Sequence, residues 1–175
     1  MILKLLHRIT KSLEDKKIDY MLSGSIALNI YIVPRMTLDI DIVVELHEKN
    51  IKDFLSIFSK NYYLNTNTVK KETKNHGMFN IIDYETGFKI DFIVRKETEF
   101  RKLEFERRRK IKIIDFDIWI VSSEDLIISK IEWIQQLQSD KQIQDIKNLI
   151  ANIKIDKEYI KKWCKKLNLK TFDLI

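Results

Sequence analysis

Two aspartates stand inside a short apolar run, and they restrict the fold of this chain more than any other feature. The run L-D-I-D-I-V-V places Asp39 and Asp41 two residues apart, and alternate residues of a β-strand point to the same face. Ile40 and Ile42 then point to the opposite face, which can be buried. Two neighbouring carboxylates repel each other by about 1–4 kcal/mol, depending on the effective dielectric constant. A strand of this kind therefore needs a positive partner beside its carboxylates.

A glycine between two serines precedes this strand. Gly24 lies where a predicted strand, residues 18–22, passes into a short helix that Pro34 stops. Glycine lets the backbone turn tightly there, and the amides at the start of the helix can receive phosphate oxygens. Ser25 can add a hydroxyl donor, and thirteen residues separate it from Asp39. Taken alone, the Gly-Ser pair is better explained as a plain turn.

A third carboxylate lies in the later run F-K-I-D-F-I-V. In a strand, Phe88, Ile90 and Phe92 would share one face, and Asp91 would lie on the other face with Lys89. Mg²⁺ and Mn²⁺ prefer oxygen ligands, so Asp39, Asp41 and Asp91 are the predicted metal ligands. Three carboxylates would allow a second metal about 4 Å from the first and activation of an attacking hydroxyl. With the Gly-Ser turn as a phosphate cradle, the pattern predicts a phosphoryl or nucleotidyl transfer site.

The combined pattern resembles a known signature. G-S, thirteen residues, D-I-D and a later K-I-D-F are similar to the hG[GS] and [DE]h[DE]h motifs of the DNA polymerase β-like nucleotidyltransferase superfamily. The run G-S-I-A-L-N-I-Y-I-V-P-R-M-T-L-D-I-D resembles the minimal and abortive-infection (AbiEii-like) branch, which includes toxins of toxin–antitoxin pairs. This likeness extends to Phe92 and implies transfer of a nucleoside monophosphate from an NTP to a hydroxyl acceptor. Relatives often have a glycine before R-x-T, whereas Pro34 stiffens that loop here.

The resemblance implies four further site residues. Arg35 and Thr37 match family positions: Arg35 would hold a phosphate or pair with the aspartates, and Thr37 would secure the start of the strand. A purely structural role is an equal alternative for both. Lys130 in S-K-I-E-W would contact nucleotide phosphate, and Asp145 in S-D-K-Q-I-Q-D-I-K-N-L would position or activate the acceptor or the base. The alternatives are a solvated Lys130 and an Asp145 that pairs with Lys141 on the surface.

Periodicity along the chain predicts an α+β (mixed α/β) fold, in which a mixed sheet is flanked by helices. We expect strands at 18–22, 38–45, 78–83, 88–94 and 115–121, and helices at 2–16, 47–60, 123–138, 140–152 and 156–168. The polar segment after residues 61–64 is expected to be a loop, and residues 99–110 a charged connection. Residues 1–121 would form the nucleotidyltransferase core and residues 122–175 a helical region packed on it.

Composition and charge indicate which partners and which cellular compartment to expect. The net charge of +6 favours polyanionic partners such as nucleotides or nucleic acid. The single cysteine, Cys164, excludes an internal disulfide framework, so we expect a cytoplasmic protein. No apolar run reaches the roughly 18 residues that a bilayer span requires, and the first ten residues lack the apolar core of a signal peptide. We therefore expect no membrane partner.

Three functional classes remain open at this stage. The first is an enzyme whose acceptor is tRNA or another RNA, a protein side chain or a small molecule such as an aminoglycoside, with a cognate antitoxin or toxin as a possible partner. The second is an inactive binding or antitoxin-like module with the same fold. The third is a sheet protein whose aspartates only make surface contacts. An inactive protein of this fold normally lacks one of the metal-binding carboxylates, and all three candidate carboxylates are present here.

Overall fold

The strands form one mixed sheet. The computed structural model describes residues 2–37, 39–136 and 139–175. Within them, seven strands lie in the order β3-β4-β5-β2-β1-β7-β6, with β2 parallel to β5, β1 parallel to β7 and the other neighbours antiparallel. Their bounds are β1 Tyr20–Ser23, β2 Asp39–Val44, β3 Tyr62–Tyr63, β4 Met78–Asp83, β5 Lys89–Val94, β6 Arg109–Ile113 and β7 Phe116–Ile120. The predicted mixed α/β class is confirmed.

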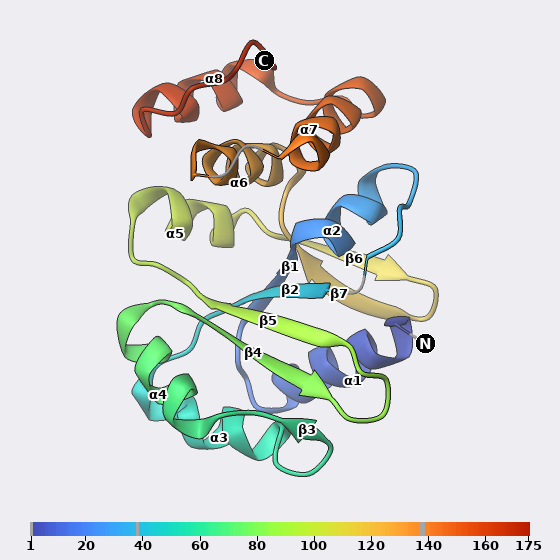
Figure 1. Ribbon diagram of the computed structural model, residues 1–175, viewed down its shortest axis with the longest axis vertical. Helices are drawn as coiled ribbons and strands as arrows, with labels where there is room; N and C mark the ends of the chain where they lie inside the picture. Colours follow the sequence, from blue (N-terminus) through green and yellow to red (C-terminus); the bar gives the residue numbers. More distant parts are fainter. Residues whose placement is uncertain (1, 38, 137–138) are drawn as a thin grey trace.

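Helices cover both faces of the sheet (Figure 1). One side carries α1 (Ile2–Asp15), α3 (Ile51–Ile57) and α4 (Thr66–Asn75). The other carries α2 (Gly24–Tyr31), α5 (Glu99–Glu106), α6 (Ser123–Gln136), α7 (Asp140–Asn152) and α8 (Lys157–Lys166). None of the described helices combines the length and the apolar character that crossing a bilayer requires.

An aromatic core lies between the sheet and α3. Phe54 of α3 and Phe58, which caps the C-terminal end of that helix, pack on Phe92 of β5, with ring centroids 5.0 and 5.4 Å from that of Phe92. Ile40 and Ile42 on β2 are completely buried on the same face. Because side chains alternate along a strand, burial of these apolar residues sends the neighbouring aspartates to the opposite face, toward α2 and α6. The apolar core thus positions the carboxylates.

Three expected segments differ in the structure. The polar segment after residues 61–64 forms α4, which Asn65 caps by accepting a hydrogen bond from the Thr68 amide at 3.0 Å. The helix expected at 47–60 is a short 3₁₀ turn, Glu48–Asn50, followed by α3. The charged segment 99–110 contains α5 and the start of β6. Residues 38, 137 and 138, which were expected in a strand and a helix, lie outside the described residues.

Candidate active site

The three strand aspartates share one face of the sheet on two adjacent strands. The parallel register of β2 and β5 places Asp41 directly beside Asp91 and Asp39 beside Lys89. On the other side of β2, Ser23 at the end of β1 is the antiparallel partner of Asp41. The carboxylates predicted from separate strands are therefore neighbours, next to the turn that leads into α2.

Asp41 packs against that turn. Gly24 has φ +60°, and a Cβ built on it would lie 1.8 Å from Oδ2 of Asp41. Only glycine fits here, because the backbone is left-handed and the carboxylate fills the space of a side chain. Burial raises the pKa of Asp41, and the charges of Asp91 and Asp39 raise it further, against a hydrogen bond from the Ser25 amide and attraction to Lys130. Asp41 is thus a buried carboxylate whose charge is further disfavoured by two neighbouring aspartates.

Lys89 supplies positive charge at this face. Its Nζ lies 2.8 Å from Oδ2 of Asp91 and 3.5 Å from Oδ1 of Asp39. The hydrogen bond to Asp91 raises the pKa of Lys89. The sequence pattern placed Lys89 on the carboxylate face but assigned it no role. Its position two residues before Asp91 was the available signal.

A second charged cluster joins α2, α6 and α7. Asp145 accepts hydrogen bonds from Nε and Nη2 of Arg35 at 2.9 and 2.8 Å, and from Nζ of Lys130 at 2.9 Å. Only 2% of Asp145 and 5% of Lys130 is exposed. The alternatives of a solvated Lys130 and of a surface pair between Asp145 and Lys141 are therefore wrong. Gln142, which the sequence reasoning missed, also accepts from Nζ of Lys130, at 2.8 Å.

The pKa directions in this cluster follow from burial and pairing. Burial alone would raise the pKa of Asp145, but the hydrogen bonds from Arg35 and Lys130 hold it below its ordinary value. Burial lowers the pKa of Lys130 despite its contacts with Asp145. One buried carboxylate thus compensates two cations, which leaves positive charge beside the Gly24 turn.

Arg35 connects this cluster to the turn. Its Nη2 donates to Oγ of Ser25 at 2.9 Å, so the Ser25 hydroxyl proton is free to be donated elsewhere. Asn29 of α2 clamps the Arg35 backbone, donating to its carbonyl at 2.7 Å and accepting from its amide at 3.0 Å. Arg35 thus takes Asp145, rather than a strand aspartate, as its ion-pair partner. Thr37 makes one long contact, 3.5 Å to the Asp39 carbonyl.

The donor set fits a hard divalent cation. Three carboxylates on one face offer the oxygen ligands that Mg²⁺ and Mn²⁺ prefer. Burial raises the pKa of Asp41, and the neighbouring charges of Asp91 and Asp39 raise it further, so a cation beside these carboxylates would favour their charged forms. Among the described residues no three acidic, His or Cys side chains are already arranged around a metal position, and Lys89 lies between two of the carboxylates. Asp39, Asp41 and Asp91 are the residues that would hold the cation.

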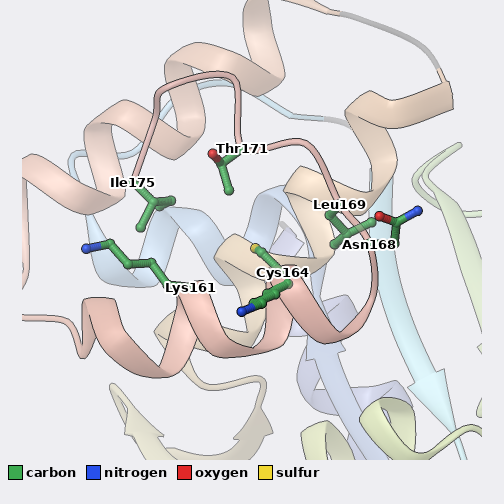
Figure 2. Close-up of a pocket in the computed structure, with 7 residues that line it drawn as sticks. Lys161, Cys164, Asn168, Leu169, Thr171 and Ile175 are labelled. Carbon is green, nitrogen blue, oxygen red and sulfur yellow. The ribbon is translucent and has the colours of Figure 1, made fainter.

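A separate hollow lies between α8 and the C-terminal segment (Figure 2). None of the predicted site residues lines it. The side chains that surround it are Lys161, Cys164, Lys165, Asn168, Leu169, Thr171 and Ile175. The carboxylate face, rather than this hollow, carries the chemistry predicted from the sequence.

The fold is that of the nucleotidyltransferases. The antibiotic-resistance factor ANT(2'')-Ia in solution aligns with a TM-score of 0.65 at 11% identity, over 94% of this chain and 90% of that one. A crystal structure of ANT(2'')-Ia with adenylyl-2''-tobramycin aligns at 0.57 and 13%, over 94% and 95%. The lincosamide antibiotic adenylyltransferase LnuA, bound to lincomycin, aligns at 0.58 and 14%, over 86% and 97%. No protein family model matches the sequence, and no curated protein sequence matches it.

The Gly24 turn can be tested with a matched pair of glycines. Gly24→Ala should destabilise the protein by about 2–5 kcal/mol, because left-handed backbone costs a residue with a Cβ about 1–2 kcal/mol and overpacking adds about 1–3 kcal/mol. Gly87→Ala, at φ +71° with nothing near its Cβ, should lose only the backbone part. Urea unfolding measures both variants. Equal losses of unfolding free energy in the two variants would show that the Asp41 carboxylate does not exclude a Cβ at residue 24.

Proposed function

We propose that the protein is a metal-dependent nucleotidyltransferase that moves a nucleoside monophosphate from an NTP to a hydroxyl acceptor. The observation that carries this proposal is the direct cross-strand pairing of Asp41 with Asp91, together with the contact of Asp41 with the Gly24 turn. A carboxylate pair and a phosphate cradle thus meet at one place. The nucleotidyltransferase fold supports the same activity.

The strand aspartates take two roles in the proposed reaction. Asp39, Asp41 and Asp91 would hold Mg²⁺ or Mn²⁺, which supplies neutralisation of phosphate charge when bound. Asp91 also accepts the proton of the acceptor hydroxyl as general base. The acceptor oxygen forms a bond to the α-phosphorus, the bond from that phosphorus to the bridging oxygen breaks, and pyrophosphate leaves with the electron pair. The proton of the acceptor hydroxyl thus passes to Asp91, and the nucleotidyl group passes to the acceptor oxygen.

The second cluster serves the triphosphate. The Ser25 hydroxyl, whose oxygen already accepts from Arg35, donates to a phosphate oxygen, and the Gly24 turn lets the phosphates approach the backbone. Lys130 and Arg35 contribute positive charge, and Asp145 positions both. Thr37 helps to hold the start of β2. Every predicted binding residue then has a place around one nucleotide.

We propose ATP as the donor and a small polyhydroxyl compound as the first acceptor to examine. LnuA is an adenylyltransferase with bound lincomycin, and ANT(2'')-Ia has been solved with an adenylylated tobramycin. The resemblance of G-S-I-A-L-N-I-Y-I-V-P-R-M-T-L-D-I-D to the AbiEii-like branch instead favours tRNA or protein as acceptor, with a toxin–antitoxin role. The acceptor assay distinguishes these possibilities.

The experiment compares α-labelled with γ-labelled NTPs. Each of the four NTPs is incubated with the protein and Mg²⁺ or Mn²⁺, in separate reactions with aminoglycosides and lincosamides, total tRNA and cell protein. Label from the α-position, but not from the γ-position, should appear on one acceptor class. Binding of NTP by calorimetry without any transfer would favour the inactive binding module. Neither binding nor transfer would contradict the proposal.

A further inference from the structure

Lys89 stands where positive charge is most needed on the carboxylate face. It is the cross-strand neighbour of Asp39 and lies two residues before Asp91 on the same strand face. Its ammonium group is within 2.8 Å of one carboxylate and 3.5 Å of the other. The backbone register itself therefore brings a lysine between two predicted metal ligands.

We propose that Lys89 partly compensates the charges of Asp39 and Asp91 when no metal is bound, and that it must leave them for a divalent cation to bind. The inference rests on the proposed function, because that function assigns the aspartates as metal ligands. An ion bound to the same oxygen of Asp91 would lie at most about 5 Å from Nζ, since magnesium–oxygen distances are about 2.1 Å. Repulsion at that separation is strong, so the lysine and the metal compete for the carboxylates.

The lysine is able to leave without a change in the fold. Its side chain is 42% exposed, whereas that of Asp91 is only 11% exposed. A lysine ammonium is carried on a flexible four-carbon stem, so it can move while β5 remains in the sheet. Asp91 has no such freedom. The cost of opening the site therefore falls on the Lys89 contacts, rather than on the strand pairing.

Release of Lys89 would link the metal to the nucleotide. A freed ammonium beside the carboxylates is placed to interact with triphosphate oxygens, which compensate the charge that Asp39 and Asp91 no longer neutralise. Bound nucleotide then stabilises the conformation in which Lys89 has left the carboxylates, and metal binding requires the same conformation. Because binding linkage is reciprocal, metal and NTP should each raise the affinity of the other through Lys89. In this scheme Lys89 contacts the carboxylates before the metal binds and the triphosphate afterwards.

The test measures Mn²⁺ affinity by electron paramagnetic resonance, without nucleotide and then with a non-hydrolysable ATP analogue. Lys89→Met should bind Mn²⁺ about 10- to 100-fold more tightly than wild type without nucleotide, in the usual range of coupling between sites. Lys89→Arg should stay close to wild type, and Lys96→Met, at an exposed position after β5, should be unchanged. The analogue should increase Mn²⁺ affinity more in wild type than in Lys89→Met. Adding Asp91→Asn to Lys89→Met should abolish the tight binding.

Two results would overturn the inference. Mn²⁺ affinity that is equal or weaker in Lys89→Met, in protein that melts at the wild-type temperature, would show that Lys89 does not compete. Tight binding that survives Asp91→Asn would place the metal elsewhere. If wild type transfers no nucleotide but Lys89→Met gains Mn²⁺ affinity, the proposed function fails and the competition stands. If wild type transfers nucleotide and the variant gains nothing, only the role of Lys89 fails.

Discussion

Asp41→Asn is expected to reduce nucleotidyl transfer at least about 1000-fold while leaving the protein as stable as wild type or more stable. Removal of a group that stabilises transition-state charge commonly costs about 10²–10³ in rate, and Asp41 would also hold the cation. Asparagine keeps the shape of the side chain and can still accept the hydrogen bond from the Ser25 amide. The loss of activity should therefore not come from unfolding.

The expected effect of Asp41→Asn on the free energy of unfolding follows from the raised pKa of Asp41. Burial and the neighbouring aspartates raise the folded-state pKa of Asp41, so the native state binds more protons than the unfolded state between the ordinary and the raised pKa. Stability from this group consequently falls as pH rises through that window, and the full penalty is present once the pH is above the raised pKa. Asp41→Asn removes the penalty.

Thermal melting and transfer of α-label measure the two effects of Asp41→Asn together. The control is Asp117→Asn on β7, where the side chain is 52% exposed and 3.4 Å from Nζ of Lys110. Its activity and melting temperature should match those of wild type. If Asp41→Asn keeps more than a tenth of wild-type transfer, Asp41 does not have the role proposed for it.

Asp145→Ala is expected to destabilise the protein by about 3–5 kcal/mol, the usual cost of removing one partner from a buried ion pair. Lys130, with 5% of its surface exposed, would then lie beside Arg35 without the carboxylate that accepts the hydrogen bonds of both side chains. The double variant Lys130→Met/Asp145→Ala should recover part of the loss, because it leaves no lysine ammonium buried.

Urea unfolding at neutral pH measures the free energy of unfolding of these variants. Asp140→Ala in the first turn of the same helix is the control, since this aspartate is exposed and contributes about 0.3–1 kcal/mol to a helix start. A loss below 1 kcal/mol for Asp145→Ala would show that Lys130 finds another partner or water. The ion pairs of the cluster would then contribute little to stability.

The carboxylate face could be predicted from the local sequence, because the side chains of a strand alternate between its two faces every second residue. Alternation alone put Asp39 and Asp41 on one side of a strand and Ile40 on the other. The direct pairing of Asp41 with Asp91 depends on the register of two parallel strands joined by a long crossover, which no local pattern contains. The sequence therefore indicated the three carboxylates but not how they meet.

The contacts of the second cluster and the helix α4 could not be predicted from local sequence pattern. Arg35 and Asp145 are 110 residues apart, and only the packing of α7 near α2 makes them partners. The polar composition of residues 66–75 resembles a loop, because just Val69 and Thr73 of α4 are buried. Capping by Asn65 was the one local signal for that helix. Lys89 was placed on the correct face, but its contacts depend on the strand register.

The most direct measurement is a crystal structure with Mn²⁺ and a non-hydrolysable ATP analogue, in which anomalous scattering locates the metal. We expect an anomalous peak about 2.1–2.3 Å from carboxylate oxygens of Asp39 and Asp41, with Asp91 in or next to the coordination shell. The triphosphate should lie along the Gly24–Ser25 turn, and Nζ of Lys89 should have moved away from Asp39. A metal peak distant from these aspartates, or a nucleotide bound away from the turn, would contradict the proposed site.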